Sequence, residues 1–107
     1  MEVMPKLDGR VRLYDDATGR ATKLLAFAEL TIADAFVIKG IRVLKRDEPG
    51  EDEPFIAFPA ERGKGTAADR WYDLAHPTTV EARAAATVLL LSRYRQACEA
   101  SQAGARG

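Results

Sequence analysis

The stretch LLAFAELTIADAFVIKGIRVLK (24–45) decides the fold class of this 107-residue chain. Its two parts, 24–32 and 36–45, are rich in apolar and β-branched residues with period-two spacing, which is typical of β-strands. Because the connection between them is very short, we expect an antiparallel hairpin. The alternation predicts one face with Val37, Ile41 and Val43 and another with Phe36, Ile38 and Leu44.

Three shorter segments extend the predicted sheet on either side of the hairpin. Residues 10–15 alternate apolar and charged side chains, while 55–60 and 70–74 read as short strands. Between them, 46–54 carries five carboxylates with proline and glycine, which indicates a solvated loop. Residues 61–69 are small, polar and glycine-bearing, so we expect a mobile surface loop there.

A helix is predicted from Thr79 to about Glu99. Thr78 followed by Glu81 matches a capping box, in which each side chain satisfies a free backbone donor at the helix start. One apolar stripe recurs at helical spacing and is expected to lie on the sheet: Val80, Ala84, Val88, Leu91, Tyr94 or Arg95, and Cys98.

The opposite side of the predicted helix carries Leu89 beside Ala82, Ala85 and Ala86. This smooth apolar surface is a candidate dimer interface, with strand pairing as the alternative way to join two chains. The elements together predict an α+β fold: a small antiparallel sheet of about five strands followed by one long C-terminal helix. We expect a single domain over 1–99 and a disordered tail over 100–107.

Composition narrows the class of protein. Sixteen basic and sixteen acidic residues give a formal net charge of zero, which argues against a polycation that coats nucleic acid but allows a local basic patch. The single cysteine rules out an internal disulfide and fits a reducing compartment. The N-terminus lacks the apolar region of a secretory signal, and no apolar run approaches the about 20 residues that span a membrane. We therefore expect a cytoplasmic protein without membrane association.

The only histidine, His76, is not expected to take part in catalysis. Asp73 is three residues upstream, on the opposite face of a strand, and is poorly placed as its partner. A catalytic zinc would need three protein ligands, and one histidine with one distant cysteine do not supply them. No glycine-rich phosphate loop has the required spacing. We expect no catalytic residue, metal, cofactor or small-molecule substrate, and a structural role for His76 at the helix start.

The order of the elements resembles the SpoVG (septation protein, stage V sporulation protein G) family. AFVIKGIRVL (35–44) is similar to the family's F-V-[VI]-x-[DG]-I-[RK]-V-[IL] strand, and FIAFPAER (55–62) to its F-[VI]-A-[MF]-P-S-[KR]-[KR] segment. YDLAHP (72–77) is similar to its x-D-I-A-H-P element, the most specific of the three. The resemblance extends from about Arg10 to about Arg95. It implies a small α+β homodimer that binds DNA, and in some cases RNA, as a regulator of septation, sporulation or gene expression.

Nine cations are candidates for contact with a phosphate backbone. They are Arg42, Lys45 and Arg46 at the end of the long strand, Arg62, Lys64 and Arg70 in and after the polar loop, and Arg83, Arg93 and Arg95 on the helix. The loop pair Arg62 and Lys64 is the strongest, since Arg62 matches one of the family's two basic positions. At strand spacing we expect Trp71, Tyr72 and Phe58 in the core rather than stacked on bases.

Departures from the family support an alternative function. Glu61 stands at the first basic position, Ala60 replaces the preceding serine, and the acidic loop would repel phosphate. The alternative is a protein-interaction module that keeps the SpoVG fold and has lost nucleic-acid binding.

Overall fold

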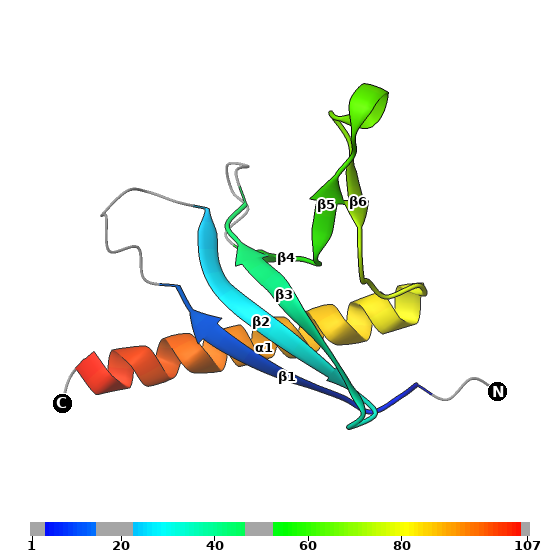
Figure 1. Cartoon of the computed structure of the whole chain (residues 1–107). Helices are drawn as coiled ribbons and strands as arrows, with labels where there is room; N and C mark the ends of the chain where they lie inside the picture. The colour runs from blue at the N-terminus through cyan, green and yellow to red at the C-terminus, as the bar shows by residue number, and fades with distance from the viewer. Residues whose placement is uncertain (1–3, 15–22, 47–52, 106–107) are drawn as a thin grey trace.

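The computed structural model describes residues 4–14, 23–46 and 53–105, and shows an α+β fold (Figure 1). Strands β1 (Leu7–Leu13), β2 (Leu24–Ile32), β3 (Phe36–Leu44) and β4 (Phe55–Ala57) form a four-stranded sheet in the order β1-β2-β3-β4. All neighbouring strands are antiparallel, which confirms the predicted hairpin 24–45. The long helix α1 (Val80–Ala105) lies across one face of this sheet (Figure 1).

The core lies between the sheet and α1. Its buried side chains are Ala26, Ala28 and Leu30 of β2, Ile41 and Val43 of β3, Phe58, and Ala86, Leu90 and Leu91 of α1. Leu7, Val11, Ile32, Ile38, Ile56 and Leu89 pack around them and are partly buried. A sheet with one face on a helix and one face open explains the alternation of apolar and polar residues along β1.

A β-bulge in β3 corrects the predicted strand faces. The register pairs Ala28 with Ile41 but Leu30 with Ile38, so one extra residue of β3 lies opposite Glu29. Gly40 has a φ of 81°, a left-handed conformation that glycine adopts without steric cost. The bulge turns Ile38 and Ile41 toward the same side, both against the core. The strict alternation that we expected, with these two residues on opposite faces, is therefore wrong.

The helix also faces the sheet differently from the prediction. Val80 and Val88, assigned to the sheet, are 82% and 69% exposed, whereas Ala86 is fully buried and Leu89 packs against the core. Leu91 is buried, as the predicted stripe required. Of the face assigned to a partner chain, Ala86 and Leu89 thus pack against the protein's own core, while Ala82 and Ala85 are half-buried.

The reason for this orientation is close approach between α1 and β1. Gly9 of β1 is buried, and a Cβ atom added there would lie 2.8 Å from Cδ2 of Leu90 and 3.6 Å from Cδ2 of Leu89. The lack of a side chain at Gly9 lets Leu89 and Leu90 of the helix come close to the strand at this point. The alanine side of the helix therefore packs on the sheet, and its valines are left outside.

The ends of α1 differ from the expected ones. Oγ1 of Thr79 accepts a hydrogen bond of 3.0 Å from the Ala82 amide, so Thr79 caps the helix and the predicted box between Thr78 and Glu81 is not formed. At the other end α1 continues to Ala105, so residues 100–105 of the predicted tail are helical.

A two-stranded hairpin projects from the body of the protein (Figure 1). It consists of β5 (Ala60–Arg62) and β6 (Trp71–Asp73), joined by a loop with the 3-10 helix η1 (Gly65–Ala67), and we call residues 60–73 the arm. Phe58 is buried as predicted, but Trp71 and Tyr72 are 66% and 47% exposed, so their assignment to the core is wrong. The single strand predicted over 55–60 is divided between β4 and β5.

Candidate nucleic-acid interface

Two of the three predicted helix arginines, Arg93 and Arg95, form ion pairs with other parts of the chain. Arg93 donates from Nε to the Gly9 carbonyl oxygen at 3.3 Å, and its Nη2 lies 3.2 Å from Oδ1 of Asp8. Arg95 forms an ion pair of 2.7 Å with Glu53, ahead of β4. Arg93 thus links α1 to β1, Arg95 links α1 to the segment ahead of β4, and both guanidinium groups have partners within the chain.

Asp8 shows the electrostatic effect of this arrangement. The hydrogen bond from the Gly9 amide, followed by that from Arg93, holds the pKa of Asp8 below its ordinary value. The carboxylate is therefore charged at neutral pH and neutralises the nearest helix arginine. A phosphate group would have to displace it to reach the same guanidinium.

The arm carries three of the predicted cations. Arg62 donates from Nε to the Ala68 carbonyl oxygen and so closes the arm's loop. Lys64 and Arg70 are exposed, and among the described residues neither side chain has a hydrogen bond or ion pair. The Gly63 amide donates to the Arg70 carbonyl oxygen at 2.8 Å, which keeps both sides of the hairpin together. Thus Arg62 organises the loop while Lys64 and Arg70 are available to a ligand.

A shallow groove of about 370 Å³ lies where the arm meets the sheet and the helix. Arg42 of β3 and Arg83 of α1 line it together with Trp71 and Asp73 of β6. The guanidinium of Arg83 lies 5.8 Å from the ring centroid of Phe58. The fold therefore brings two predicted cations, distant in sequence, to the base of the arm.

The other two strand-end cations lie away from this groove. Arg46 donates from Nε to the Glu53 carbonyl oxygen at 3.0 Å, and its guanidinium lies 5.3 Å from the ring centroid of Phe55. Lys45 is exposed, with its backbone amide bonded to the Lys23 carbonyl oxygen at 2.8 Å. Most of the predicted acidic loop beside them (46–54) lies outside the described residues.

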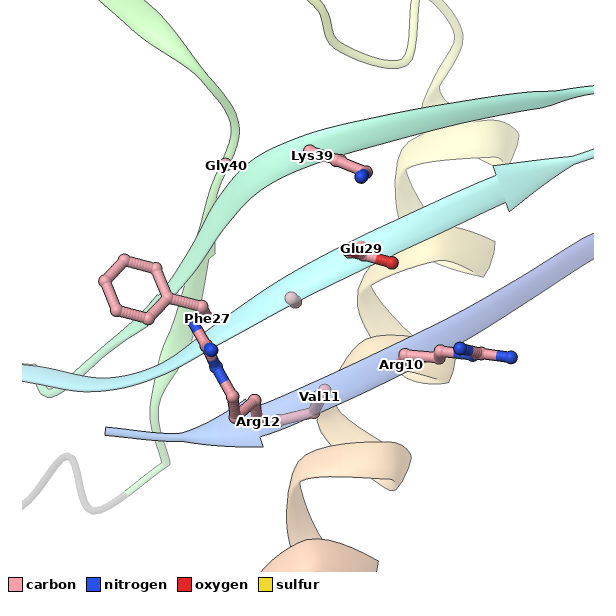
Figure 2. Close-up of a pocket in the computed structure, with 8 residues that line it drawn as sticks. Arg10, Val11, Arg12, Phe27, Glu29, Lys39 and Gly40 are labelled. Atoms are coloured by element: carbon pink, nitrogen blue, oxygen red, sulfur yellow. The ribbon is translucent and has the colours of Figure 1, made fainter. Parts of the chain in front are cut away.

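A second cationic surface was missed by the sequence analysis. On the side of the sheet away from α1, a hollow of about 500 Å³ is lined by Arg10 and Arg12 of β1, Phe27 and Glu29 of β2, and Lys39 of β3 (Figure 2). We call these five residues the outer sheet face. This surface could have been predicted from the alternation in RVRLY (10–14). Because Val11 packs on the core, its neighbours Arg10 and Arg12 must point to the opposite face of the sheet.

An aromatic group belongs to the same surface. The Arg12 guanidinium lies 5.8 Å from the centroid of the Phe27 ring, and Tyr14 meets this ring edge-on, with centroids 5.9 Å apart. Cations beside partly exposed rings are the combination with which proteins bind unpaired bases.

His76 lies in the segment between β6 and α1. The ring is exposed, with Nδ1 2.8 Å from the Pro77 carbonyl oxygen just ahead of α1. Within residues 4–14, 23–46 and 53–105, no three metal-ligating side chains of the His, Cys, Asp or Glu type gather at one point. In the same part of the chain, no helix has the length and apolar character needed to cross a membrane.

Comparison with known proteins agrees with the motifs. A family model described as SpoVG matches residues 4–96. A protein of Heliobacterium modesticaldum named "Putative septation protein SpoVG" is 31% identical over 75 residues, which is 70% of this chain and 76% of that protein. Proteins of the same name from Finegoldia magna and Desulforudis audaxviator are 31% and 33% identical over 72% and 67% of this chain, and over 65% and 74% of their own lengths.

Proposed function

Since the chain belongs to the SpoVG family, we propose that it is a regulatory, non-enzymatic protein that binds nucleic acid. The observation that carries the proposal is the projecting arm, which exposes Lys64, Arg70 and Trp71 on a two-stranded ribbon. A ribbon of this kind fits the major groove of duplex DNA, where cations contact phosphates on either side.

The groove at the base of the arm extends the same surface. Arg42 and Arg83 face it from the sheet and the helix, so the backbone of a bound duplex would meet cations along the arm and at its base. Glu61 lies on the arm as well, and its carboxylate favours a bound orientation in which the phosphates pass on the side of Lys64 and Arg70.

The arm is tested with the double variant Lys64→Ala/Arg70→Ala. We expect about tenfold weaker binding of a labelled duplex near physiological salt, and a slope of log affinity against log salt reduced by about 2, because two phosphate contacts are lost. Fluorescence anisotropy over a range of salt concentrations measures both. Lys6→Ala is the control, since this cation lies outside the arm and is paired with Asp34 at 2.8 Å.

Two results would contradict the proposal. If the wild-type protein binds neither duplex nor single strand at low salt, nucleic-acid binding is wrong and the alternative of a protein-interaction module takes its place. If the Lys6 control, which removes one charge, loses half as much in log affinity as the arm variant, which removes two, the effect is one of total charge and the arm is not the binding element.

We also propose that two chains form a homodimer through the outer face of α1, formed by Val80, Ala84 and Val88. This replaces the alanine face, which lies against the protein's own sheet. We expect Val88→Glu to convert the dimer to a monomer in sedimentation experiments, because a charge would be buried at the contact. Ser101→Glu, which adds the same charge at an exposed position of the same helix, is expected to leave the dimer intact. A dimer unchanged by Val88→Glu would exclude this face and leave strand pairing at the edge of the sheet.

A further inference from the structure

We infer that the outer sheet face binds an unpaired segment of nucleic acid and selects a guanine base through Glu29. This rests on the proposed function and assigns a second site, separate from the arm and specific for single strands.

The strand register arranges the outer sheet face in two rows. In the first, Arg10 of β1 is directly opposite Glu29 of β2, and Glu29 in turn faces the bulge at Lys39 of β3. A carboxylate thus lies between two cations on three neighbouring strands, and Figure 2 shows all three side chains pointing to the same side. The two cations are two strand spacings apart, about 10 Å at their backbones.

The second row places an aromatic ring beside a guanidinium group. Phe27 of β2 is directly opposite Arg12 of β1. The guanidinium of Arg12 lies 5.8 Å from the centroid of this ring, and both residues line the hollow. A base can stack on such a surface whatever its sequence.

The charges of this face are unpaired among the described residues. The side chains of Arg10, Lys39 and Glu29 form no hydrogen bond or ion pair with other described residues, although adjacent strands bring them close in register. Together with Arg12 the face has three cations for one carboxylate, in a chain whose total charge is zero. An anionic chain that runs across the strands would neutralise the surplus.

The shape of the face favours a single strand over a duplex. The hollow is a broad depression in a sheet surface, with no element that could enter a groove of the double helix. In a duplex the bases are stacked and paired, so only phosphates would reach the sheet. In a single strand the bases can turn toward protein side chains and offer their Watson–Crick edges.

Glu29 determines which base fits. A carboxylate only accepts hydrogen bonds, through two oxygens side by side. Guanine presents two adjacent donors on its Watson–Crick edge, the N1 hydrogen and the N2 amino group, and so pairs with both oxygens. Adenine and cytosine present a ring-nitrogen acceptor next to their amino donor, which the second oxygen would repel, and uracil and thymine present a single donor between two carbonyl groups. Arg10 and Lys39 would then contact the phosphates on either side of the bound guanine.

The experiment uses the full chain and labelled single strands, as RNA and as DNA: oligouridine or oligothymidine, and the same sequence with one central guanine or one central cytosine. A duplex of mixed sequence serves as the comparison. The variants are Arg10→Ala/Lys39→Ala and Glu29→Gln on the sheet, and the arm variant Lys64→Ala/Arg70→Ala. All of these residues are at or near the surface, and melting curves would verify that each variant is folded.

We expect the Arg10/Lys39 variant to bind the guanine-containing strands about tenfold more weakly, with a salt slope smaller by about 1.4, while duplex binding is unchanged. Glu29→Gln is expected to remove the preference for guanine and to strengthen binding of all the single strands, because one negative charge is lost. The arm variant is expected to weaken duplex binding selectively.

Either of two results would overturn the inference. One is a Glu29→Gln variant that keeps the wild-type order of base preference. The other is an Arg10/Lys39 variant that binds single strands as well as the wild type, or that loses duplex and single-strand binding equally. If the arm variant alone is impaired, nucleic-acid binding stands and only the sheet site is wrong. If the wild type binds no probe, the proposed function is wrong together with it.

Discussion

Leu90→Ala is expected to lower the free energy of unfolding by about 3 kcal/mol, the largest effect among these predictions. The side chain is fully buried between α1 and the sheet, and it contacts the point at which β1 comes closest to the helix. Its removal leaves a cavity that the surrounding sheet can fill only in part, because the strands are held by their hydrogen-bond ladder.

The matched control is Leu74→Ala. This leucine is 62% exposed just after the arm, so the same chemical change is expected to alter stability by less than about 0.5 kcal/mol. Urea unfolding followed by circular dichroism, at one protein concentration, measures both variants. Equal effects of the two substitutions would show that Leu90 is not in the core and that α1 packs through its other face.

Gly9→Val is expected to destabilise the protein by about 2 kcal/mol. Valine is favoured over glycine in a strand, so without a steric conflict the substitution would stabilise β1. The conflict arises because the Cβ atom alone would lie 2.8 Å from Leu90 Cδ2, and Leu90 is buried on all sides. The sign of the effect therefore reports directly on the contact between strand and helix.

The two substitutions are expected to be coupled. In a Leu90→Ala background the space released by the leucine accepts part of the new valine, so Gly9→Val should cost about 1 kcal/mol less than in the wild type. The same unfolding measurements on the double variant test this. Strict additivity, or a stabilising Gly9→Val, would contradict the close approach seen between β1 and α1.

The sequence was sufficient to predict the hairpin and the helix, because their periodicities of two and 3.6 residues are strong over long segments. It was insufficient where one local contact overrides the pattern. Alternation alone puts Ile38 and Ile41 on opposite faces, and only the bulge with Gly40 in a left-handed conformation brings both to the core. The helix has apolar residues on several sides, so the choice between Val88 and Ala86 depends on the space left by Gly9.

For the candidate site too, the sequence was sufficient for some residues and insufficient for others. The cations of the arm could be found from the polar, glycine-bearing loop that holds Lys64. Arg93 is equally basic in the sequence, but its contacts with Asp8 and Gly9 appear only when strand and helix, distant in the chain, are packed together. Arg10 and Lys39 were not among the predicted cations because the role proposed for them depends on register, which places them on either side of Glu29.

The projection of the arm away from the body has a consequence for the dynamics of the protein. Its own sheet consists of two three-residue strands, and the exposed Trp71 contributes little burial to hold them. The amide hydrogens of β5 and β6 will therefore exchange with solvent through local opening, while those of β2 and β3 exchange mainly when the whole domain unfolds. The arm is a separate cooperative unit of low stability, and a ligand that orders it must offset the conformational entropy that it loses.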